Sequence, residues 1–438
     1  MQHKLVRVLM VVVLLAMFSS LAAAQDKAVV TWGFWGSPEE AATHTSVAEA
    51  FMEANPDIEI EIWHQPWSDY FTSLDTLWAA GDGALIPDVL FLSPPIRYAA
   101  RGVLEELTPY IEANDYDISD FWPGLLEYGT TYDEDGTRRI WGFPRDIGLE
   151  VLYYNREIFD EVGVAYPTDD WTWDDLLAAA EQLTVVESTG RVSRYALGME
   201  GGKFALFVLQ NNGGLLDDMR NPTTCLLDSP ESIEAVEFFA GMMDNNYAMR
   251  SANLGQAGGD AAVFQSGQVA MIIQNASRVS AFNAADMNYD VAPVPIPADG
   301  RRAAAAGGAA WTMSALSDDK ESAWTFLSWL QSTDGGQGIY TASGEILPAL
   351  ESTALSEAFL GSEENPADPP DNRMAFIIEG RNAKPGGRVA YFPEWGEING
   401  NYIRPVMNQI WAGEAVPAEV LPGVCDDVDA YLADLNAG

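Results

Sequence analysis

The chain has 438 residues, of which 48% are apolar and 11% aromatic, enough for one large hydrophobic core or two ordinary ones. A mean hydropathy of −0.05 with this aromatic content excludes a disordered or fibrous chain. The formal net charge is −42, from 65 Asp and Glu against 23 Lys and Arg. A surface this acidic repels phosphate backbones and anionic lipid, which excludes nucleic-acid binding.

The N-terminal segment has the three parts of a secretory signal peptide. Lys4 and Arg7 supply a positive start, residues 8–18 are apolar, and an alanine triplet ends at Ala24. The apolar run is too short to span about 30 Å of hydrocarbon as a stable anchor. We therefore expect residues 1–24 to be removed, which leaves the mature protein in the periplasm or secreted. Because no cysteine lies near the cleavage site, we expect no lipid anchor.

Strands and helices alternate along the rest of the chain. The periodicity predicts strands over residues 29–32, 58–62, 87–92, 151–154 and 269–273, and helices opening at Ser37-Pro38 and Ser229-Pro230 and covering 68–80, 173–183 and much of 402–435. Two stretches interrupt this order: residues 290–308, a predicted inter-lobe crossing, and residues 361–373, a predicted surface loop. Such alternation predicts an α/β protein with two lobes, each a mainly parallel sheet covered on both faces by helices.

The two cysteines, Cys225 and Cys425, lie 200 residues apart in the sequence. An even number of cysteines in an exported chain permits one disulfide bond. The bond requires Cα atoms within about 7 Å of each other, and the sequence leaves open whether the fold brings them that close.

Residue patterns for catalysis and for metal or cofactor binding are absent from the sequence. After residue 24 only His44 and His64 remain, and neither has a partner at the spacing of a metal site or a catalytic triad. No phosphate-binding loop is present, and residues 133–136 predict a tight turn rather than a calcium loop. An acid pair among 65 carboxylates stays open, but nothing in the order of residues indicates one. We therefore expect no enzyme activity, no cofactor and no metal.

Aromatic residues stand beside small polar residues in loops where ligands bind. Trp35 follows the first predicted strand directly, and ligands of α/β sheets bind outside the carboxyl ends of strands. Trp311 and Trp395 also lie in loops that contain Gly or Pro. An indole face suits the C–H face of a pyranose ring, while neighbouring polar groups bind its hydroxyls. This interpretation predicts that alanine at Trp35 or Trp311 weakens sugar binding by about 1–3 kcal/mol.

Six segments in a fixed order carry a resemblance to a known family: 51–58 (FMEANPDI), 87–89 (PDV), 102–107 (GVLEEL), 142–159 (GFP through YYNREIF, with WDDL at 173–176), 264–271 (FQSGQVAM) and 343–348 (SGEILP). The chain resembles the extracellular solute-binding proteins of ABC importers, in the carbohydrate-binding branch that includes maltodextrin-binding proteins. The resemblance covers almost the whole mature chain.

The resemblance implies a two-lobed clamp that closes on its ligand by hinge motion and delivers it to a membrane permease. It places inter-lobe crossings near residues 145–150, 303–308 and 342–347. The implied division puts residues 25–145 and 304–345 in the first lobe, and 146–303 and 346–438 in the second. The expected partners are a carbohydrate and the permease subunits, with the protein itself a monomer that hydrolyses nothing.

The resemblance also places residues from both lobes and the crossings in the ligand site: Trp35, Gly36, Ser37, Ser93, Arg145, Asp146, Phe204, Asn275, Arg278, Gly308, Trp311, Tyr391 and Trp395. Where the maltodextrin branch has a stacking tryptophan, this sequence has Ser277, which argues against a maltodextrin as the ligand.

Three alternatives remain open at the level of sequence. Some relatives bind an anionic solute such as a glycerol phosphate, and Arg145 and Arg278 are the cations that could bind one here. The other two are a secreted glycan-cleaving enzyme and a surface adhesin without a closing cleft.

Overall fold

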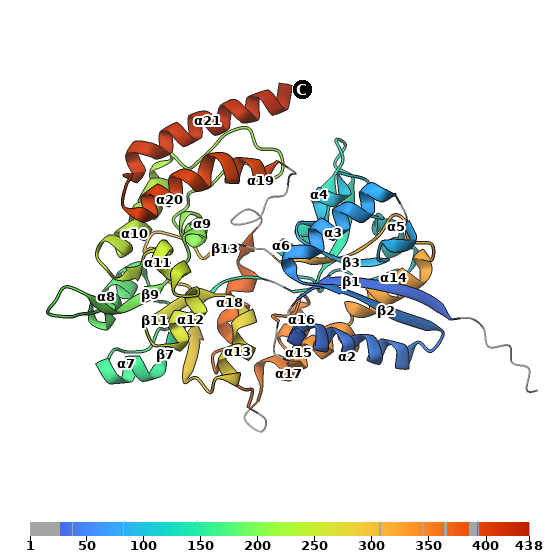
Figure 1. Cartoon of the computed structure of the whole chain (residues 1–438), viewed down its shortest axis with the longest axis horizontal. Coiled ribbons are helices and arrows are strands. Elements are labelled where there is room, and N and C mark those ends of the chain that lie inside the picture. The colour runs from blue at the N-terminus through green and yellow to red at the C-terminus, as the bar shows by residue number, and fades with distance from the viewer. Residues whose placement is uncertain are drawn as a thin grey trace, which may run out of the picture.

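The computed structural model describes residues 27–437 except 37, 82, 147, 306–307, 344–345, 363–365, 385–391 and 393. Figure 1 shows two lobes side by side, each built around its own sheet with helices on both faces. The predicted α/β fold class and its two-lobed architecture are therefore confirmed. The predicted signal peptide, Ser37 and Tyr391 lie outside the described residues.

The first lobe contains a five-stranded sheet in the order β2-β1-β3-β14-β6. Its strands are β1 (Ala28–Trp35), β2 (Ile58–Gln65), β3 (Val89–Leu92), β6 (Gly142–Pro144) and β14 (Ala310–Met313). Strands β1, β2 and β3 pair in parallel, whereas β14 runs antiparallel to both β3 and β6. A separate hairpin of β4 (Thr130–Tyr132) and β5 (Arg138–Ile140) extends from this lobe.

The second lobe contains a six-stranded sheet in the order β10-β9-β11-β7-β12, with β8 on β9. Its strands are β7 (Val151–Asn155), β8 (Val185–Val186), β9 (Val192–Gly198), β10 (Ala248–Met249), β11 (Val269–Gln274) and β12 (Tyr289–Ala292). Strands β10, β9 and β11 are parallel, and β7 runs antiparallel to β11 and β12.

The reversed strands β14 and β7 are the ones that the chain enters from the other lobe. The chain leaves β6 at residue 144, passes through residues 145–150 and starts β7; later it leaves β12 and starts β14 at residue 310. A segment that arrives across the cleft enters the sheet at the edge where the parallel strands end. It must therefore run in the opposite direction to them, which explains one reversed strand beside otherwise parallel neighbours.

Helices cover both sheets (Figure 1). Those next to the first sheet are α2 (Pro38–Ala54), α3 (Trp67–Ala80), α4 (Pro95–Ala99), α5 (Thr108–Ala113), α6 (Pro123–Leu126), α14 (Lys320–Leu330) and α15 (Gly336–Ser343). Those next to the second are α7 (Arg156–Val162), α8 (Trp173–Leu183), α9 (Phe204–Gln210), α10 (Pro230–Asp244), α11 (Ser251–Gln256), α12 (Asp260–Gln265), α13 (Val279–Ala284), α19 (Trp395–Glu397), α20 (Arg404–Ala412) and α21 (Pro417–Ala437).

Local hydrogen bonds explain where several helices begin. Thr172 Oγ1 accepts from the Asp175 amide at 3.2 Å, and the Asp175 carboxylate accepts from the Thr172 amide at 2.8 Å, so a reciprocal capping box opens α8. Ser229 Oγ accepts from the Ser232 amide at 3.2 Å and caps α10, with Pro230 at the first helical position. Both starts agree with the sequence prediction.

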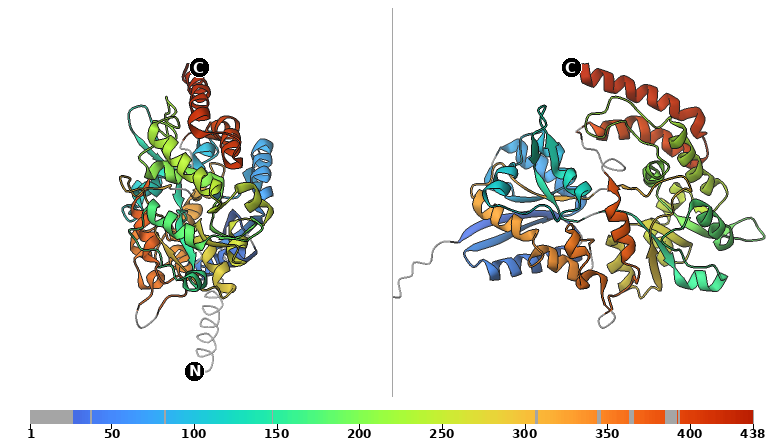
Figure 2. Two further views of the ribbon diagram at one scale, coloured as in Figure 1. Left: turned by 90° about the vertical axis from the view of Figure 1, so that its left-hand side faces the viewer. Right: turned by 180° about the vertical axis from the view of Figure 1, so that it is seen from behind.

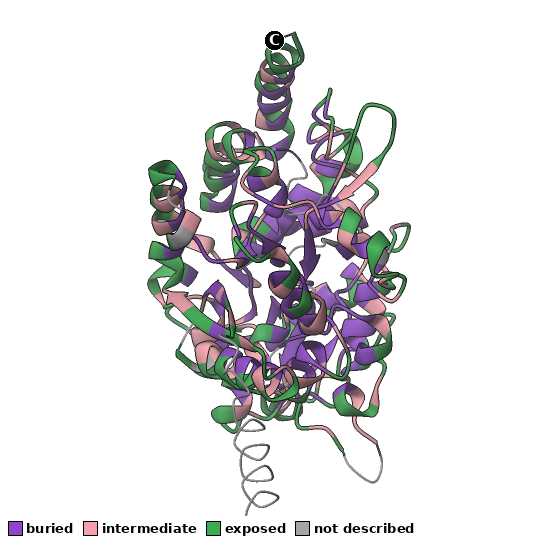
Figure 3. Ribbon diagram, turned by 90° about the vertical axis from the view of Figure 1, so that its right-hand side faces the viewer, coloured by how far each residue is buried: buried purple, intermediate pink, exposed green. Residues whose placement is uncertain are grey.

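Buried residues concentrate in the strands and on the inner faces of the helices, and exposed residues cover the outside (Figure 3). One core contains Trp32, Phe34, Phe91 and Trp311 of the first lobe, continues through residues 346–377, and extends into the second lobe at Tyr153 and Phe264. A second core contains Leu197, Phe207, Phe239 and Trp411 of the second lobe. The disulfide between Cys225 and Cys425, left open by the sequence, is present and ties the loop before α10 to α21. Figure 2 shows the C-terminal helices along the top edge of that lobe.

The return of the chain to the second lobe comes later than the predicted boundary at residue 346. Helices α16 (Glu351–Ala354) and α17 (Glu357–Leu360) pack against α15, and Trp122 of the first lobe donates its Nε1–H to the Pro348 carbonyl at 2.9 Å. Helix α18 (Met374–Arg381) is the next element along the chain, and it contacts β7. The packing of α16 and α17 on α15 and the Trp122–Pro348 hydrogen bond hold residues 346–360 on the first lobe, which periodicity alone does not reveal.

Candidate functional site

A cavity of about 350 Å³ lies where the two lobes meet, and we call it the hinge pocket. It collects residues from the carboxyl ends of β1, β2 and β3, from the crossings, and from the loop after β11. Its described lining is Trp35, Glu40, Trp67, Phe91, Ser93, Arg145, Asp146, Gly148, Asn275, Ala276, Ser277, Gly308, Ala309, Ile346 and Leu347. Six predicted site residues therefore meet in one place: Trp35, Ser93, Arg145, Asp146, Asn275 and Gly308.

The first-lobe wall of the hinge pocket is aromatic. The Trp35 ring stacks on Phe91 with centroids 4.2 Å apart and contacts the edge of Trp67 at 5.0 Å. Trp67 is the first residue of α3 and is 58% exposed. Exposure of so large an apolar ring to solvent is unfavourable and is typical of a binding surface. Behind Phe91 lies Trp311, 4.4 Å away and completely buried. The wall is thus a rigid apolar surface open to the cavity on one side.

One arginine and two carboxylates give the crossing its charge. Arg145 donates to Asp146 at 2.5 Å from Nη2 and lies 3.8 Å from Glu40, with its guanidinium 4.4 Å from the Phe91 ring centre. Burial by itself would lower the pKa of Arg145, but the charges of Asp146 and Glu40 raise it above its usual value. Arg145 therefore stays charged, and the carboxylates of Asp146 and Glu40 already balance its charge.

Ser93 and Gly308 join the first lobe to the second crossing. Ser93 Oγ donates to the Gly308 carbonyl at 2.9 Å and lies 2.8 Å from the Tyr128 hydroxyl. Gly308 has φ +157°, and a Cβ atom there would stand 3.1 Å from the Asp146 carbonyl oxygen. Gly308 thus allows the crossing segment to pass close to Asp146, and the hydrogen bond from Ser93 holds that segment in place.

The second-lobe wall is a polar loop. The Asn275 carbonyl accepts from the buried Tyr153 hydroxyl at 2.8 Å, and its side-chain oxygen accepts from Ser277 Oγ at 2.6 Å. These bonds hold the loop after β11 in place and leave the exposed Ser277 at the cavity. Ser277 stands where the maltodextrin branch has a stacking tryptophan, so this wall offers hydroxyl and amide groups instead of a ring.

Phe204 and Trp395 lie together in a second cavity of about 290 Å³, which we call the distal pocket. Its described lining is Gly201, Gly202, Phe204, Ser251, Trp395, Asn399, Arg404, Met407, Asn408 and Trp411. It belongs to the second lobe alone. Gly201 and Gly202 follow β9, Phe204 begins α9 and Ser251 begins α11. The remaining residues come from α19, from α20 and from the π-helix between them (Ile398–Ile403).

The other predicted residues lie outside these linings. Trp311 is fully buried between Trp32 and Phe91, which corrects its predicted place in the site: it supports the aromatic wall from behind. Gly36 borders the pocket, and its carbonyl contacts His64 Nε2 at 3.0 Å. Arg278 follows Ser277 but is not part of the described lining, and its Nε is buried without a hydrogen-bond partner among the described residues.

Sequence reasoning missed several residues of the hinge pocket, of which Trp67 and Glu40 matter most. Trp67 directly follows β2, so the rule that selected Trp35 after β1 would also have selected it. Glu40 lies on α2 and reaches the pocket only because α2 begins beside the end of β1. Nothing in the local sequence indicates that approach.

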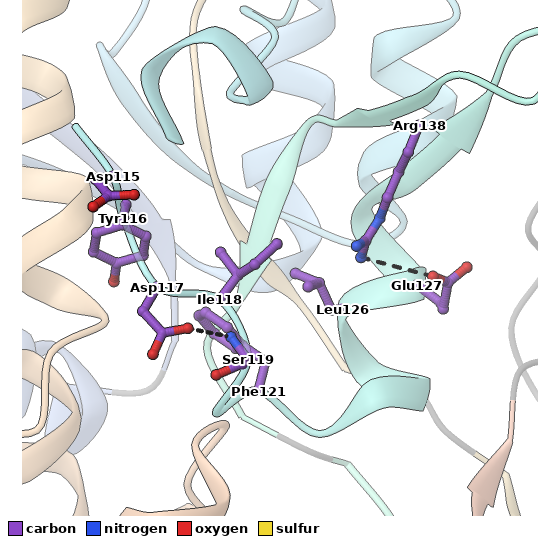
Figure 4. A pocket seen from close by; sticks show the side chains of 9 residues that line it. All are labelled: Asp115, Tyr116, Asp117, Ile118, Ser119, Phe121, Leu126, Glu127 and Arg138. Carbon is purple, nitrogen blue, oxygen red and sulfur yellow. Dashed lines mark hydrogen bonds and ion pairs between the residues drawn. The ribbon is translucent and has the colours of Figure 1, made fainter. Parts of the chain in front are cut away.

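A larger cavity of about 650 Å³ lies entirely within the first lobe (Figure 4). Figure 4 shows Arg138 aimed at Glu127, 3.7 Å away, and Asp117 aimed at the backbone of Ser119. All its described lining residues lie between residues 115 and 138, and none was a predicted site residue. Because it contains no predicted site residue and its arginine is already paired with Glu127, we assign no ligand to it.

His44 is buried in the first lobe, 2.6 Å by its Nδ1 from the Tyr340 hydroxyl, and burial lowers its pKa well below the usual value. It is therefore neutral and belongs to the core. Among the described residues no group of three or more His, Cys, Asp and Glu side chains gathers as metal ligands. No helix in the described part of the chain is long and apolar enough to span a bilayer.

Comparison with known proteins agrees with this architecture. An arabinooligosaccharide-binding protein of Halalkalibacterium halodurans is 30% identical over 224 residues, 49% of this chain and 48% of that protein. An sn-glycerol-3-phosphate-binding periplasmic protein of Brucella abortus is 24% identical over 322 residues, 69% of this chain and 70% of that one. An ABC substrate-binding protein of Listeria monocytogenes, solved with cycloalternan, superposes with a TM-score of 0.78 at 26% identity, covering 93% of this chain and all of that one.

A model of the bacterial extracellular solute-binding proteins matches residues 46–367, about three quarters of the chain. That span includes the strands of both sheets except β1, and the described residues of the hinge pocket except Trp35 and Glu40. The chain belongs to the bacterial extracellular solute-binding protein family.

Proposed function

We propose that this protein is the substrate-binding component of an ABC importer and captures a mono- or oligosaccharide in the cleft between its lobes. The observation that carries the proposal is the hinge pocket, which opposes exposed indoles of one lobe to a polar loop of the other. The likeness to sugar-binding relatives supports the same assignment.

The chemistry of the two walls fits a sugar ring. The Trp35 and Trp67 faces present a dry apolar surface to the C–H groups of a pyranose or furanose. Ser277 and Asn275 present hydroxyl and amide groups to the sugar hydroxyls. Because the two kinds of contact belong to different lobes, a bound sugar would make both sets only in the closed state, which shifts the population toward closure.

The charge of the hinge pocket disfavours a small phosphorylated solute such as a glycerol phosphate. Arg145 is already paired with Asp146 and lies near Glu40, so the pocket carries two carboxylates against one cation. Arg278, the second cation considered for this role, lies outside the described lining. A phosphate would therefore have to displace Asp146 from Arg145, whereas a neutral sugar would not.

The remaining parts of the proposal follow from the family. The mature protein, released after residue 24 and without a lipid anchor, works in the periplasm or outside the cell as a monomer. It offers the closed pair of lobes to the permease subunits and releases the sugar unchanged, without catalysis.

Titration calorimetry against a panel of neutral mono- and oligosaccharides, sn-glycerol 3-phosphate and amino acids tests the proposal. We expect saturable binding of at least one sugar and, on its addition, a smaller radius of gyration in solution scattering. A flat response to every sugar together with binding of another solute class would overturn the carbohydrate assignment.

Two further readouts separate the other classes. New reducing ends after incubation with the bound oligosaccharide would identify a glycan-cleaving enzyme. Saturable sugar binding with no compaction would identify a surface lectin or adhesin rather than a closing receptor.

A further inference from the structure

Arg404 lines the distal pocket without an ion pair in the described part of the chain. Cations are scarce in this protein, at 23 Lys and Arg against 65 Asp and Glu, and most described arginines are bound to a carboxylate. Arg250 shows the contrast nearby: it bonds Asp244 at 2.7 Å and the Trp411 carbonyl at 3.0 Å. Arg404 therefore distinguishes the distal pocket, because most other described arginines of this acidic protein are paired with a carboxylate.

The rest of the distal pocket also offers donors and lacks acids. Ser251 Oγ is buried without a hydrogen-bond partner among the described residues, although it lines the cavity. Asn399 and Asn408 add side-chain amides, and no described lining residue is Asp or Glu. A buried hydroxyl left unbonded costs free energy unless a ligand or water completes it, so Ser251 indicates that something polar enters here.

The hinge pocket and the distal pocket lie at the same edge of the second-lobe sheet. Strands β9 and β11 are parallel neighbours, with Gly198 opposite Ile272. Their carboxyl ends therefore stand about 5 Å apart, and they lead to Gly201 of the distal pocket and Asn275 of the hinge pocket. Figure 1 shows α19, which carries Trp395, on the side of the second lobe that faces the first.

We infer that the ligand is an oligosaccharide with an acidic unit, and that its carboxylate binds Arg404 while a neutral unit occupies the hinge pocket. This inference rests on the proposed function and specifies its substrate class. In the distal pocket Trp395 and Phe204 supply the apolar contact for the ring, and the guanidinium forms paired hydrogen bonds with the carboxylate of a uronic acid. Ser251 and the two asparagines bind the remaining oxygens.

The net charge of the protein does not oppose this assignment at short range. Repulsion from distant carboxylates is screened beyond about 8 Å at physiological ionic strength. The contact with Arg404 is local, and one charge-assisted pair contributes enough to discriminate at least about tenfold between an acid and its neutral counterpart.

The test compares uronic-acid disaccharides with their neutral counterparts by titration calorimetry at one salt concentration: galacturonate, glucuronate and mannuronate dimers beside galactose, glucose and mannose dimers. The variants are Arg404→Gln and a matched control, Arg191→Gln. Arg191 belongs to the same lobe, is exposed, and pairs only with Glu187 in the described structure. Thermal unfolding of each variant checks the fold.

We expect the wild-type protein to bind one acidic dimer at least about tenfold more tightly than its neutral counterpart. Arg404→Gln should remove that preference and leave the affinity for the neutral dimer within about twofold, and Arg191→Gln should change neither. Equal binding of acid and neutral dimers by the wild type, or an acid preference that survives Arg404→Gln, overturns the inference while the sugar-receptor function stands. Absence of binding to any saccharide overturns the proposed function itself.

Discussion

The two walls of the cleft are built in different ways. On the first lobe, Trp35 and Phe91 stack directly on the buried core, with Trp311 behind them. On the second lobe, the groups that line the hinge pocket belong to the loop after β11, where hydrogen bonds hold Asn275 and Ser277 in place. The first wall is a rigid surface, and the second is a set of polar groups carried on loops.

This difference suggests that the aromatic wall binds sugar rings in general and that the polar loops select among them. A flat aromatic surface accepts many sugar rings with similar energy, because every ring has a C–H face. Polar groups on loops can select among rings, because a hydroxyl or acid without its partner is costly once buried. Single substitutions in each wall test this difference, because we can compare their effects on the free energy of unfolding with their effects on sugar binding.

The largest expected effect is on Trp311, the support of the aromatic wall. Trp311→Ala removes a completely buried indole and should lower the free energy of unfolding by about 3–5 kcal/mol, measured by urea denaturation. This loss of stability comes from the removal of packing in the core of the first lobe and not from the loss of a ligand contact. A change below about 1 kcal/mol would contradict the assignment of Trp311 to the core.

The next effect, on the pH dependence of stability, concerns Glu379 of α18. Its carboxylate is completely buried and accepts from Arg302 at 2.7 Å and from the Val294 amide at 3.0 Å. Burial raises its pKa from 4.5 to about 7, and Arg302 offsets only part of that shift. Between these two pH values the folded protein holds a proton that the unfolded chain has lost, so its stability falls as the pH rises.

Glu379→Gln removes this proton uptake. From pH 4.5 to pH 8 the unfolding free energy of the variant, relative to wild type, should rise by about 3 kcal/mol, measured by urea denaturation at four pH values. Glu181→Gln, at an exposed glutamate of α8, is the matched control and should show no such trend. Parallel pH curves for Glu379→Gln and wild type would refute the buried-acid explanation.

A smaller effect, on binding alone, is expected at Trp67. Trp67→Ala removes a half-exposed ring from the aromatic wall and should weaken sugar binding by about 1–3 kcal/mol in calorimetry. Its unfolding free energy should stay within about 0.5 kcal/mol of wild type, unlike that of Trp311→Ala. If both tryptophan variants lost stability equally, Trp67 would be a packing residue.

The smallest effect is expected where the lobes touch away from the hinge. Arg220 of the second lobe donates to the Thr130 carbonyl at 2.7 Å, forms an ion pair with Glu127, and lies 5.1 Å from the Tyr132 ring centre. Met219 beside it packs on Ile96 and Tyr128. Arg220→Ala should therefore favour the open state and weaken sugar affinity by about 1 kcal/mol, seen as a larger radius of gyration in scattering. The control is Arg191→Ala, which should change neither measurement.

Much of the fold could be predicted from the sequence because it depends on local patterns. Helix α8 covers the predicted range 173–183, and β11 covers the predicted apolar run. The end of a strand marks a ligand loop, which identified Trp35, and the family resemblance added Ser93 and Asn275. The same patterns did not separate Trp311 from Trp35, because both are aromatic residues beside small ones, and only the packing of β14 between β3 and β6 buries the former.

Apolar periodicity, capping residues and strand-end positions thus determined by themselves the elements, the two-lobed α/β class and part of the pocket, since each depends on neighbours within a few residues. Tertiary structure alone decided that Cys225 meets Cys425, that Glu40 and Asp146 flank Arg145, and that residues 346–360 stay on the first lobe. These contacts join segments that are distant in sequence, and the packing of the elements against one another brings them together.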